Sequence, residues 1–171
     1  MYRFIYAYRF QVLTGLRPGE LRGLKKGDIV GDIVYVFRSI NSYGEITDGK
    51  NKNAKRKFAL TKMAKEVLAD QKALNIDSEY IFGDISLNTY GKRFAKYCAH
   101  NNIPHTTLYE LRHTFVSIAK KLSEGQIKSI VGHSKNMDTF GTYGHEIKGE
   151  LQETANDLGK IFSDVFGQSG L

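Results

Sequence analysis

The segment Thr107-Leu-Tyr-Glu-Leu-Arg-His-Thr-Phe115 contains a helix start and the first turns of its inward face. Thr107 followed three residues later by Glu110 is typical of a capping box, in which both side chains accept hydrogen bonds from free backbone N–H groups. Apolar residues then recur three or four positions apart, a spacing that predicts a helix with one side in the core. The expected inward residues are Leu111, Phe115, Ile118 and Leu122. Arg112 is therefore expected in the second turn of this helix.

Downstream of this segment the same signals continue. Ser123 and Gln126 repeat the capping pattern, and Gly132 is expected to end the short helix that they open. The segment 147–166 then carries an apolar stripe at helical spacing. Two roles are open for this last helix: docking on its own body or on a neighbouring subunit, and an ordinary place in the core.

Upstream, the chain is also mostly helical by its pattern. The aromatic segment 2–13 has near-helical spacing and ends at Thr14-Gly15. A second helix is expected to begin at Pro18, a favoured first helical position, and to end at Gly27. Two more helices are predicted over 61–74 and 88–101. In the latter, Tyr90, Phe94 and Cys98 stand four apart on one side, which makes Cys98 a core residue.

Residues 28–60 change to a β-type pattern. Short runs over 29–30, 33–37 and 58–60 are rich in β-branched and aromatic residues and are separated by glycine and polar residues. We expect a small antiparallel sheet with a long basic connection before its last strand. The fold class is therefore α+β, mostly helical, and its 171 residues suit a single domain spanning 1–171.

Composition narrows the class of partner. The chain has a net charge of +7, and the basic excess lies in residues 1–144, whereas 145–171 are acidic on balance. This distribution suits a polyanion-binding body, although a solvated basic surface would give the same charge. No apolar run is long enough for a membrane span and no signal peptide is evident, so we expect no membrane partner. Cys98 is the single cysteine, which excludes an intrachain disulfide and fits the cytoplasm.

Four short stretches carry candidate chemistry. They are Thr14-Gly-Leu-Arg-Pro-Gly-Glu-Leu21, Lys50-Asn-Lys-Asn-Ala-Lys-Arg-Lys57, Tyr109-Glu-Leu-Arg-His-Thr-Phe115, and Gly132-His-Ser with Thr142-Tyr-Gly-His145. Each is weak alone, but their types, order and spacing together resemble the tyrosine recombinase family of phage and integrative-element integrases. The resemblance implies the catalytic-domain fold of that family, and it covers the chain from Thr14 to His145.

The resemblance also implies a reaction. Members of this family break and rejoin DNA by transesterification, through a 3′-phosphotyrosine bond and a free 5′-hydroxyl. Because bond energy is conserved, neither ATP nor a metal is required, and no cofactor is expected. The partner is double-stranded DNA, on which a homotetramer is expected, and the products are integration or excision of a mobile element.

Five residues match the catalytic set implied by the resemblance. Two arginines suit a pentacoordinate phosphorane, because each guanidinium is a fixed fork that binds two phosphate oxygens. The lysine would protonate the leaving 5′-oxygen, the histidine would donate to a phosphate oxygen or take a proton, and the tyrosine is the nucleophile. The matches are Arg17, Lys50, Arg112, His133 and Tyr143. Alignment back from Arg56 favours Lys50 over Lys52.

Other residues have supporting roles by the same resemblance. The basic segment that holds Lys50 is expected to contact DNA through Lys52, Lys55, Arg56 and Lys57. Behind the catalytic residues we expect Glu20, His113 and His145 as supports. Glu20 stands three residues beyond Arg17 and is therefore able to pair with it.

One residue departs from the family pattern. The family usually has histidine three positions before its second arginine, and here that position is Tyr109. Since positions three apart share a helix face, the Tyr109 hydroxyl is expected to reach the same phosphate as a neutral donor. Tyr109 also favours an alternative, a DNA-binding relative with impaired catalysis, which a test for covalent adducts would reveal. A type IB topoisomerase, a second alternative, would relax supercoils as a monomer.

The family usually carries an N-terminal DNA-binding domain. This chain begins almost at the first arginine motif, so that domain is expected upstream of the sequence. The single domain 1–171 would then be the catalytic part, with 147–166 as a C-terminal docking helix within it. If that helix serves assembly, truncation after Lys148 should weaken assembly more than folding.

Overall fold

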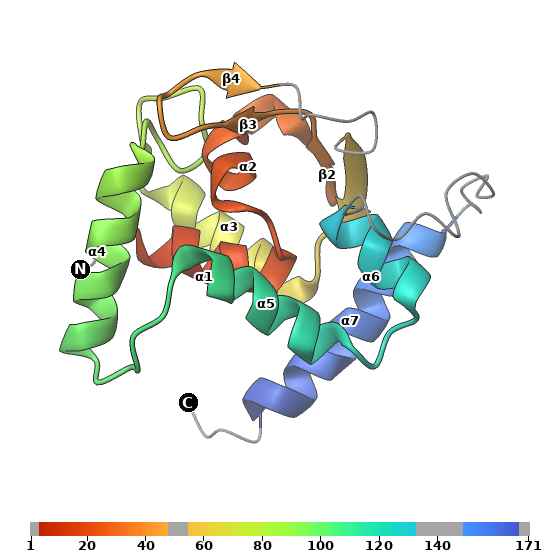
Figure 1. Ribbon diagram of the computed structural model, residues 1–171. Coiled ribbons are helices and arrows are strands. Elements are labelled where there is room, and N and C mark those ends of the chain that lie inside the picture. Colours follow the sequence, from red (N-terminus) through yellow and green to blue (C-terminus); the bar gives the residue numbers. More distant parts are fainter. Residues whose placement is uncertain (1–3, 48–54, 133–148, 168–171) are drawn as a thin grey trace.

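The computed structural model describes residues 4–47, 55–132 and 149–167. Helices dominate the described part, and the short antiparallel strands lie along one side of them (Figure 1). The α-helices are α1 (Ile5–Thr14), α2 (Pro18–Gly23), α3 (Lys62–Ala73), α4 (Leu87–His100), α5 (Leu108–Ala119), α6 (Glu124–Val131) and α7 (Glu150–Gly167). The expected α+β fold, mostly helical with a small sheet, is confirmed.

The strands form two small antiparallel sheets. β1 (Ile29–Val30), β2 (Ile33–Val36) and β5 (Arg56–Ala59) make a three-stranded sheet with β2 in the middle. β3 (Ser39–Ile40) and β4 (Ile46–Thr47) form a separate hairpin that the sequence pattern did not predict. In the β2–β5 register Val34 faces Phe58, and both side chains are buried.

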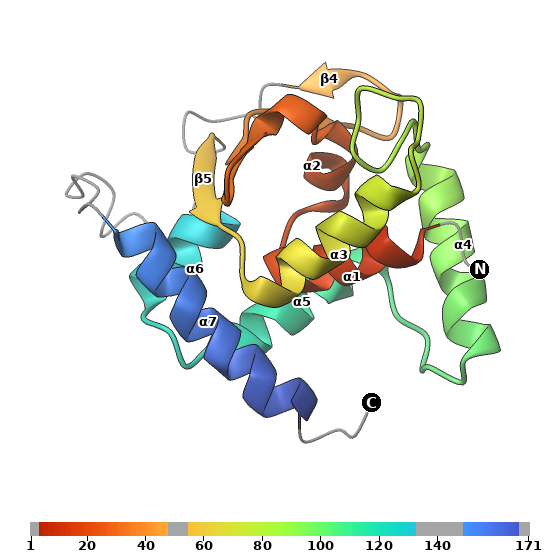
Figure 2. The ribbon, with the colours of Figure 1, turned by 180° about the vertical axis from the view of Figure 1, so that it is seen from behind.

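α1 lies between α3 and α5 and packs against both (Figure 2). It ends, as predicted, at Gly15, which has a left-handed φ of 65°. A side chain at this position would place a Cβ 2.5 Å from the Phe115 ring, so glycine is needed for backbone conformation and for space alike. Gly15 therefore allows the α1–α2 turn to sit directly on α5.

α5 begins with the capping box that its sequence predicts. The Thr107 hydroxyl accepts from the backbone N–H of Glu110, and the Glu110 carboxylate accepts from that of Thr107. Phe115 is fully buried, and its ring centroid lies 6.1 Å from that of Phe162 on α7. This contact fixes α7 beside α5.

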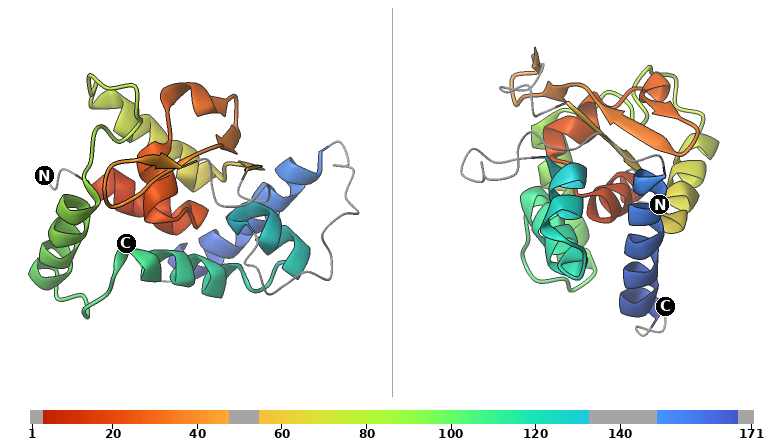
Figure 3. Two further views of the ribbon diagram at one scale, coloured as in Figure 1. Left: turned by 45° about the horizontal axis from the view of Figure 1, so that its top comes forward. Right: turned by 90° about the vertical axis from the view of Figure 1, so that its right-hand side faces the viewer.

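α7 lies at the opposite end of the molecule from α4 (Figure 3). It packs on α5 and β5 of its own chain. Leu158, Ile161 and Phe162 are buried in the common core. The described residues therefore show the helix packed against its own body, an arrangement that fits both of the roles that the sequence leaves open.

The second helix ends earlier than predicted, at Gly23 rather than Gly27. After Leu24 the chain is extended, Lys25 pairs with Tyr80 in an isolated β-bridge, and a short 3-10 turn, η1, follows over Lys26–Asp28. The Asp28 carboxylate caps that turn by accepting from the backbone N–H of Lys25. These tertiary and capping bonds replace the expected last helical turn.

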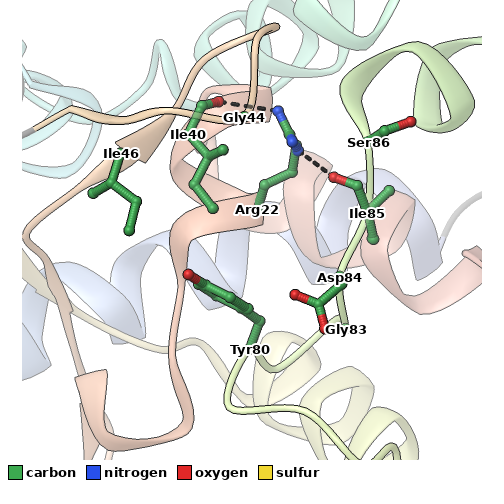
Figure 4. A pocket seen from close by; sticks show the side chains of 9 residues that line it. All are labelled: Arg22, Ile40, Gly44, Ile46, Tyr80, Gly83, Asp84, Ile85 and Ser86. Carbon is green, nitrogen blue, oxygen red and sulfur yellow. Dashed lines mark hydrogen bonds between the residues drawn. The ribbon is translucent and has the colours of Figure 1, made fainter.

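Arg22 at the end of α2 holds the β3–β4 hairpin in place (Figure 4). Its side chain donates from Nη1 to the carbonyls of Ile40 and Asn41 at 3.1 and 2.9 Å, and from Nε to that of Ile85 at 2.5 Å. The buried Arg22 also lines a hollow of about 310 Å³ between the hairpin and the loop before α4. One side chain thus ties together three segments that are distant in sequence.

Candidate active site

The first arginine motif forms the start of α2. Arg17 is the N-cap residue with extended backbone, and Pro18 follows at the first helical position, as the sequence predicts. Glu20, in the first turn, accepts from the Arg17 backbone N–H and from Arg17 Nη1, both at 2.8 Å. The Arg17 side chain keeps 33% of its surface exposed, so it is still accessible to a ligand.

Glu20 bridges two guanidinium groups. Its Oε2 lies 2.8 Å from Arg56 Nη2, and its Oε1 lies 3.0 Å from Arg56 Nη1, a bidentate pair in which each side chain is only 6% exposed. Burial by itself raises the pKa of Glu20, but the hydrogen bonds and positive charges of Arg56 and Arg17 outweigh it and lower the pKa. Glu20 is therefore ionised at neutral pH.

Arg112 reaches the same region from α5. Its Nη1 donates to the carbonyl of Gly15 at 2.8 Å, which places the guanidinium over the turn between α1 and α2. Burial, followed by the positive charge of Arg17, lowers the pKa of Arg112 to about 10, with Arg56 acting in the same direction. Three arginines from α2, β5 and α5 thus lie within electrostatic reach of one another. We call Arg17, Glu20, Arg56 and Arg112 the arginine centre.

The C-terminal end of α6 meets this centre. The carbonyl of Ile130 accepts from Arg56 Nε at 2.6 Å, and that of Val131 accepts from Arg17 Nη1 at 3.4 Å. Gly132 ends α6 with φ 78°, and a Cβ there would lie 3.4 Å from Arg56. The His133 motif therefore continues in sequence from a helix end that the centre holds directly.

Five predicted site residues lie outside the described part of the chain. They are Lys50, Lys52, His133, Tyr143 and His145. Two segments next to them in sequence are described: β5, which begins at Arg56 and follows the two lysines, and the end of α6, which precedes His133. Both of these contact the arginine centre.

Arg56, which the sequence predicts to contact DNA, is held inside the protein in this structure. Its guanidinium is bound to Glu20 and to the α6 carbonyl, and its side chain is only 6% exposed. Lys55 beside it is exposed, and Lys57 is half-buried on the outer side of β5 opposite Tyr35. The alternation of strand residues explains the difference, because neighbouring positions face opposite sides of the sheet.

Tyr109 and His113 have different surroundings on α5. Tyr109 precedes Arg112 by one turn, is 55% exposed, and interacts electrostatically with it. His113 is also exposed but lines a hollow with α7 residues such as Ile161 and Val165. The structure thus groups Tyr109 with the arginine centre and places His113 on another side of the helix.

A buried polar link that the sequence analysis missed anchors the start of α5. Gln11 Nε2 donates to the carbonyl of Leu108 at 2.9 Å, and Gln11 Oε1 accepts from the Tyr90 hydroxyl at 3.0 Å. Gln11 and Tyr90 are both fully buried. A polar residue inside the apolar segment of α1 was the available signal. The link fixes the turn that carries Tyr109 and Arg112.

The chemistry of the centre favours an anion with several oxygens. The centre holds three guanidiniums and one carboxylate, so its positive charge is only partly compensated, and the fork geometry of arginine fits phosphate oxygens. In the described ranges no three His, Cys, Asp or Glu side chains gather closely enough to hold a metal ion. No helix there is long and apolar enough to cross a membrane.

Comparison with known proteins identifies the class. The model of the phage integrase family matches residues 2–150, so the chain belongs to this family. A search of curated protein sequences found no match.

Solved structures share the fold. The Tn1549 transposon integrase in complex with transposon right end DNA is similar with a TM-score of 0.68 and 20% identity, over 91% of this chain and 59% of that one. The lambda integrase catalytic core gives 0.59 and 22%, over 78% and 81%. A lambda integrase tetramer bound to a Holliday junction gives 0.62 and 20%, over 84% and 44%. The chain thus spans less than two thirds of the Tn1549 integrase chain.

Proposed function

We propose that this chain is the catalytic domain of a site-specific DNA recombinase that cleaves and rejoins DNA through a covalent 3′-phosphotyrosine intermediate. The observation that carries the proposal is the arginine centre, in which Arg17 and Arg112 come from separate motifs to one place. Membership of the phage integrase family supports it. The enzyme is a tyrosine site-specific recombinase, a DNA strand transferase.

Arg17 and Arg112 bind the non-bridging oxygens of the scissile phosphate and stabilise the charge that develops in the transition state. The Tyr143 oxygen forms a bond to phosphorus as the bond to the 5′-oxygen breaks. Lys50 gives a proton to that 5′-oxygen, and His133 donates to a phosphate oxygen or takes the tyrosine proton. In the second step a 5′-hydroxyl attacks phosphorus and releases Tyr143.

Support for this chemistry comes from the neighbours of these residues. Glu20 orients Arg17, and Tyr109 adds a neutral donor beside Arg112. His145 remains a proposed support next to the nucleophile. The two arginines, the lysine and the histidine supply the charge and proton transfer of the reaction, so we assign it no metal or other cofactor.

The proposed partners are double-stranded DNA and further copies of the protein. Lys52, Lys55 and Lys57 provide contacts to the DNA backbone near the scissile phosphate. The lambda integrase tetramer on a Holliday junction supports a tetramer during strand exchange. Because the substrate is DNA and the domain has one buried, free cysteine, we place the reaction in the cytoplasm.

A covalent capture experiment tests the proposal without knowledge of the target sequence. The protein is incubated with a library of nicked, randomised duplexes in EDTA, and adducts that survive denaturant are recovered and sequenced. The wild type should form adducts at Tyr143, and Tyr143→Phe should form none while its DNA binding is unchanged. An adduct at another tyrosine, or a requirement for magnesium, would overturn the mechanism.

Tyr109 favours a second candidate, a DNA-binding relative that does not turn over. This candidate predicts salt-sensitive DNA binding by the wild type but no adduct with any member of the library. A type IB topoisomerase activity would instead relax supercoiled plasmid without a partner subunit. The same preparation therefore distinguishes all three by adduct, binding and relaxation assays.

A further inference from the structure

Arg56, on the buried side of the arginine centre, takes no part in the proposed reaction. Arg56 is fixed by three of its nitrogens: Nη1 and Nη2 bind Glu20, and Nε binds the carbonyl of Ile130. The Arg17 guanidinium binds Glu20 through Nη1 alone, and the Arg17 side chain keeps 33% of its surface exposed, against 6% for Arg56. The two arginines share one carboxylate unequally.

We propose that Arg56 is a positioning residue of the phosphate site: it neutralises Glu20, leaves the charge of Arg17 for a phosphate, and fixes the end of α6. The inference rests on the proposed function, in which Arg17 contacts DNA. It replaces the direct DNA contact that the sequence suggested for Arg56.

Charge balance is the first reason. With Arg56 present, Glu20 binds both guanidiniums, and the pair of arginines retains a net positive charge. Without Arg56, Arg17 would be the one guanidinium of the centre that is still hydrogen-bonded to the buried carboxylate. A close ion pair in a weakly polar surrounding is strong, so Arg17 would be drawn toward Glu20 and its attraction for phosphate would fall.

Geometry is the second reason. The Ile130 carbonyl accepts from Arg56 Nε at 2.6 Å, and a Cβ on Gly132 would lie 3.4 Å from the same guanidinium. Helix ends leave backbone carbonyls without intrahelical partners, and a cation there is favourable. Arg56 therefore joins β5, which follows the Lys50 segment, to the helix that precedes His133. Through Glu20 it also reaches the Arg17 motif.

The test compares Arg56→Met with a matched control, Arg38→Met. Arg38 also binds a carboxylate, that of Asp28, and a backbone carbonyl, that of Gly23, and its side chain is 20% exposed. It lies outside the arginine centre, so the control reports the loss of an arginine ion pair alone. Single-turnover adduct formation at saturating DNA, the salt dependence of DNA binding and the melting temperature are measured for each variant.

For Arg56→Met we expect the adduct-forming rate to fall on the order of 10²-fold, as for a misplaced catalytic group. The salt slope of binding should fall by the one contact that Arg17 loses on capture by Glu20, and it should return to the wild-type value when Glu20→Gln is added. Arg38→Met should lower the melting temperature and leave the rate and the salt slope unchanged. The double variant Glu20→Gln/Arg56→Met should be faster than Arg56→Met, because the carboxylate that would capture Arg17 is gone.

If Arg56→Met does not fold, Arg56→Lys carries the test. It keeps a positive charge beside Glu20 but cannot bind both carboxylate oxygens and the Ile130 carbonyl from one nitrogen. Its rate should fall with an unchanged salt slope.

A salt slope that falls in Arg56→Met and does not return to the wild-type value in the double variant would show a direct phosphate contact of Arg56 and overturn the inference. A rate at the wild-type level, or a double variant no faster than Arg56→Met, would overturn it as well. Absence of adduct in the wild type would sink the proposed function instead, and the salt slope would still decide whether Arg56 contacts DNA.

Discussion

Arg112 and Phe115 lie one turn apart on α5, and both meet Gly15, yet their surroundings are opposite. Arg112 donates to the Gly15 carbonyl and lies close to two other guanidiniums and one carboxylate. The Phe115 ring packs under the Gly15 Cα and against Phe162, with no exposed surface. The surroundings of Arg112 make its charge less favourable, whereas the surroundings of Phe115 stabilise the fold through apolar contacts. The same helix thus carries a site that lowers the stability of the fold and an apolar contact with α7 that raises it.

Loss of the apolar contact between α5 and α7 should have the largest effect on stability. Truncation after Lys148 removes α7, including Leu158, Ile161 and Phe162, which are at most 8% exposed. Each such side chain contributes about 1.5–3 kcal/mol on burial, against a typical total stability of about 5–15 kcal/mol. We expect no cooperative thermal unfolding for this variant, whereas a chain that ends at Gly167 should unfold cooperatively. A folded truncated domain that has lost only assembly would favour the docking role of α7 over the core role.

The buried carboxylate is the next point to test. Because the pKa of Glu20 is lowered in the folded state, its stabilising contribution is present above its ordinary value of 4.5 and is lost as the pH falls through the folded pKa. Glu20→Gln should lower the free energy of unfolding at neutral pH by about 3–5 kcal/mol, since the buried Arg56 loses the negative charge that faces it. Urea unfolding from pH 7 to pH 3 should show a flatter pH dependence for this variant.

Glu110→Gln is the matched control for that measurement. The pKa of Glu110 is also lowered, by its hydrogen bonds to Thr107, but this carboxylate is exposed at the start of α5. Its substitution should change neutral stability far less than that of Glu20. Equal effects of the two substitutions would show that burial beside arginines adds nothing.

Arg112→Met separates function from stability on α5. Burial and the charge of Arg17 lower the pKa of Arg112 to about 10, so Arg112 stays charged at neutral pH but its charge is held less favourably in the folded protein than in the unfolded chain. We expect adduct formation to fall roughly 10²–10³-fold. The free energy of unfolding should stay level or rise by about 0.5–1 kcal/mol, a common result where a site is held at a cost to the fold.

Phe115→Leu supplies the opposite case. It should lower the melting temperature, while the folded fraction of the variant retains its rate. If Arg112→Met destabilises the protein as much as Phe115→Leu, the contrast between the two sides of α5 fails.

Local signals predicted most of the helix boundaries. The Thr107 and Ser123 capping boxes and the ends at Gly15 and Gly132 depend on residues within one turn, and all four are confirmed. The early end of α2 and the β3–β4 hairpin depend on distant partners. Arg22, for example, is held by carbonyls 18, 19 and 63 positions away. Contacts with such distant residues produce no periodic pattern in the sequence.

The same distinction applies to the candidate site. The motif match singled out Arg17 and Arg112, and the structure brings them together. It did not reveal that Arg56 faces inward, because its partner Glu20 lies 36 positions away and a basic loop suggested a solvated surface. Charge type predicted the class of ligand, and only the tertiary fold shows which cation is left exposed to meet it.

Tyr109 should give the smallest effect and the sharpest distinction between packing and chemistry. Its side chain is 55% exposed, so it contributes little to the core, and its interaction with Arg112 places it beside the arginine centre. A neutral donor contributes about 1 kcal/mol, which corresponds to roughly a fivefold change in rate. Tyr109→Phe should therefore slow adduct formation by about that factor and leave the melting temperature and DNA binding near wild type.

Tyr109→His introduces a donor that gains a positive charge as the pH falls toward 6, so its rate should match or exceed that of the wild type, most clearly in the acid range. Single-turnover rates of both variants between pH 6 and pH 8, measured beside their melting temperatures, decide the matter. A silent phenylalanine variant together with a slower, less stable histidine variant would mean that Tyr109 only supports the start of α5.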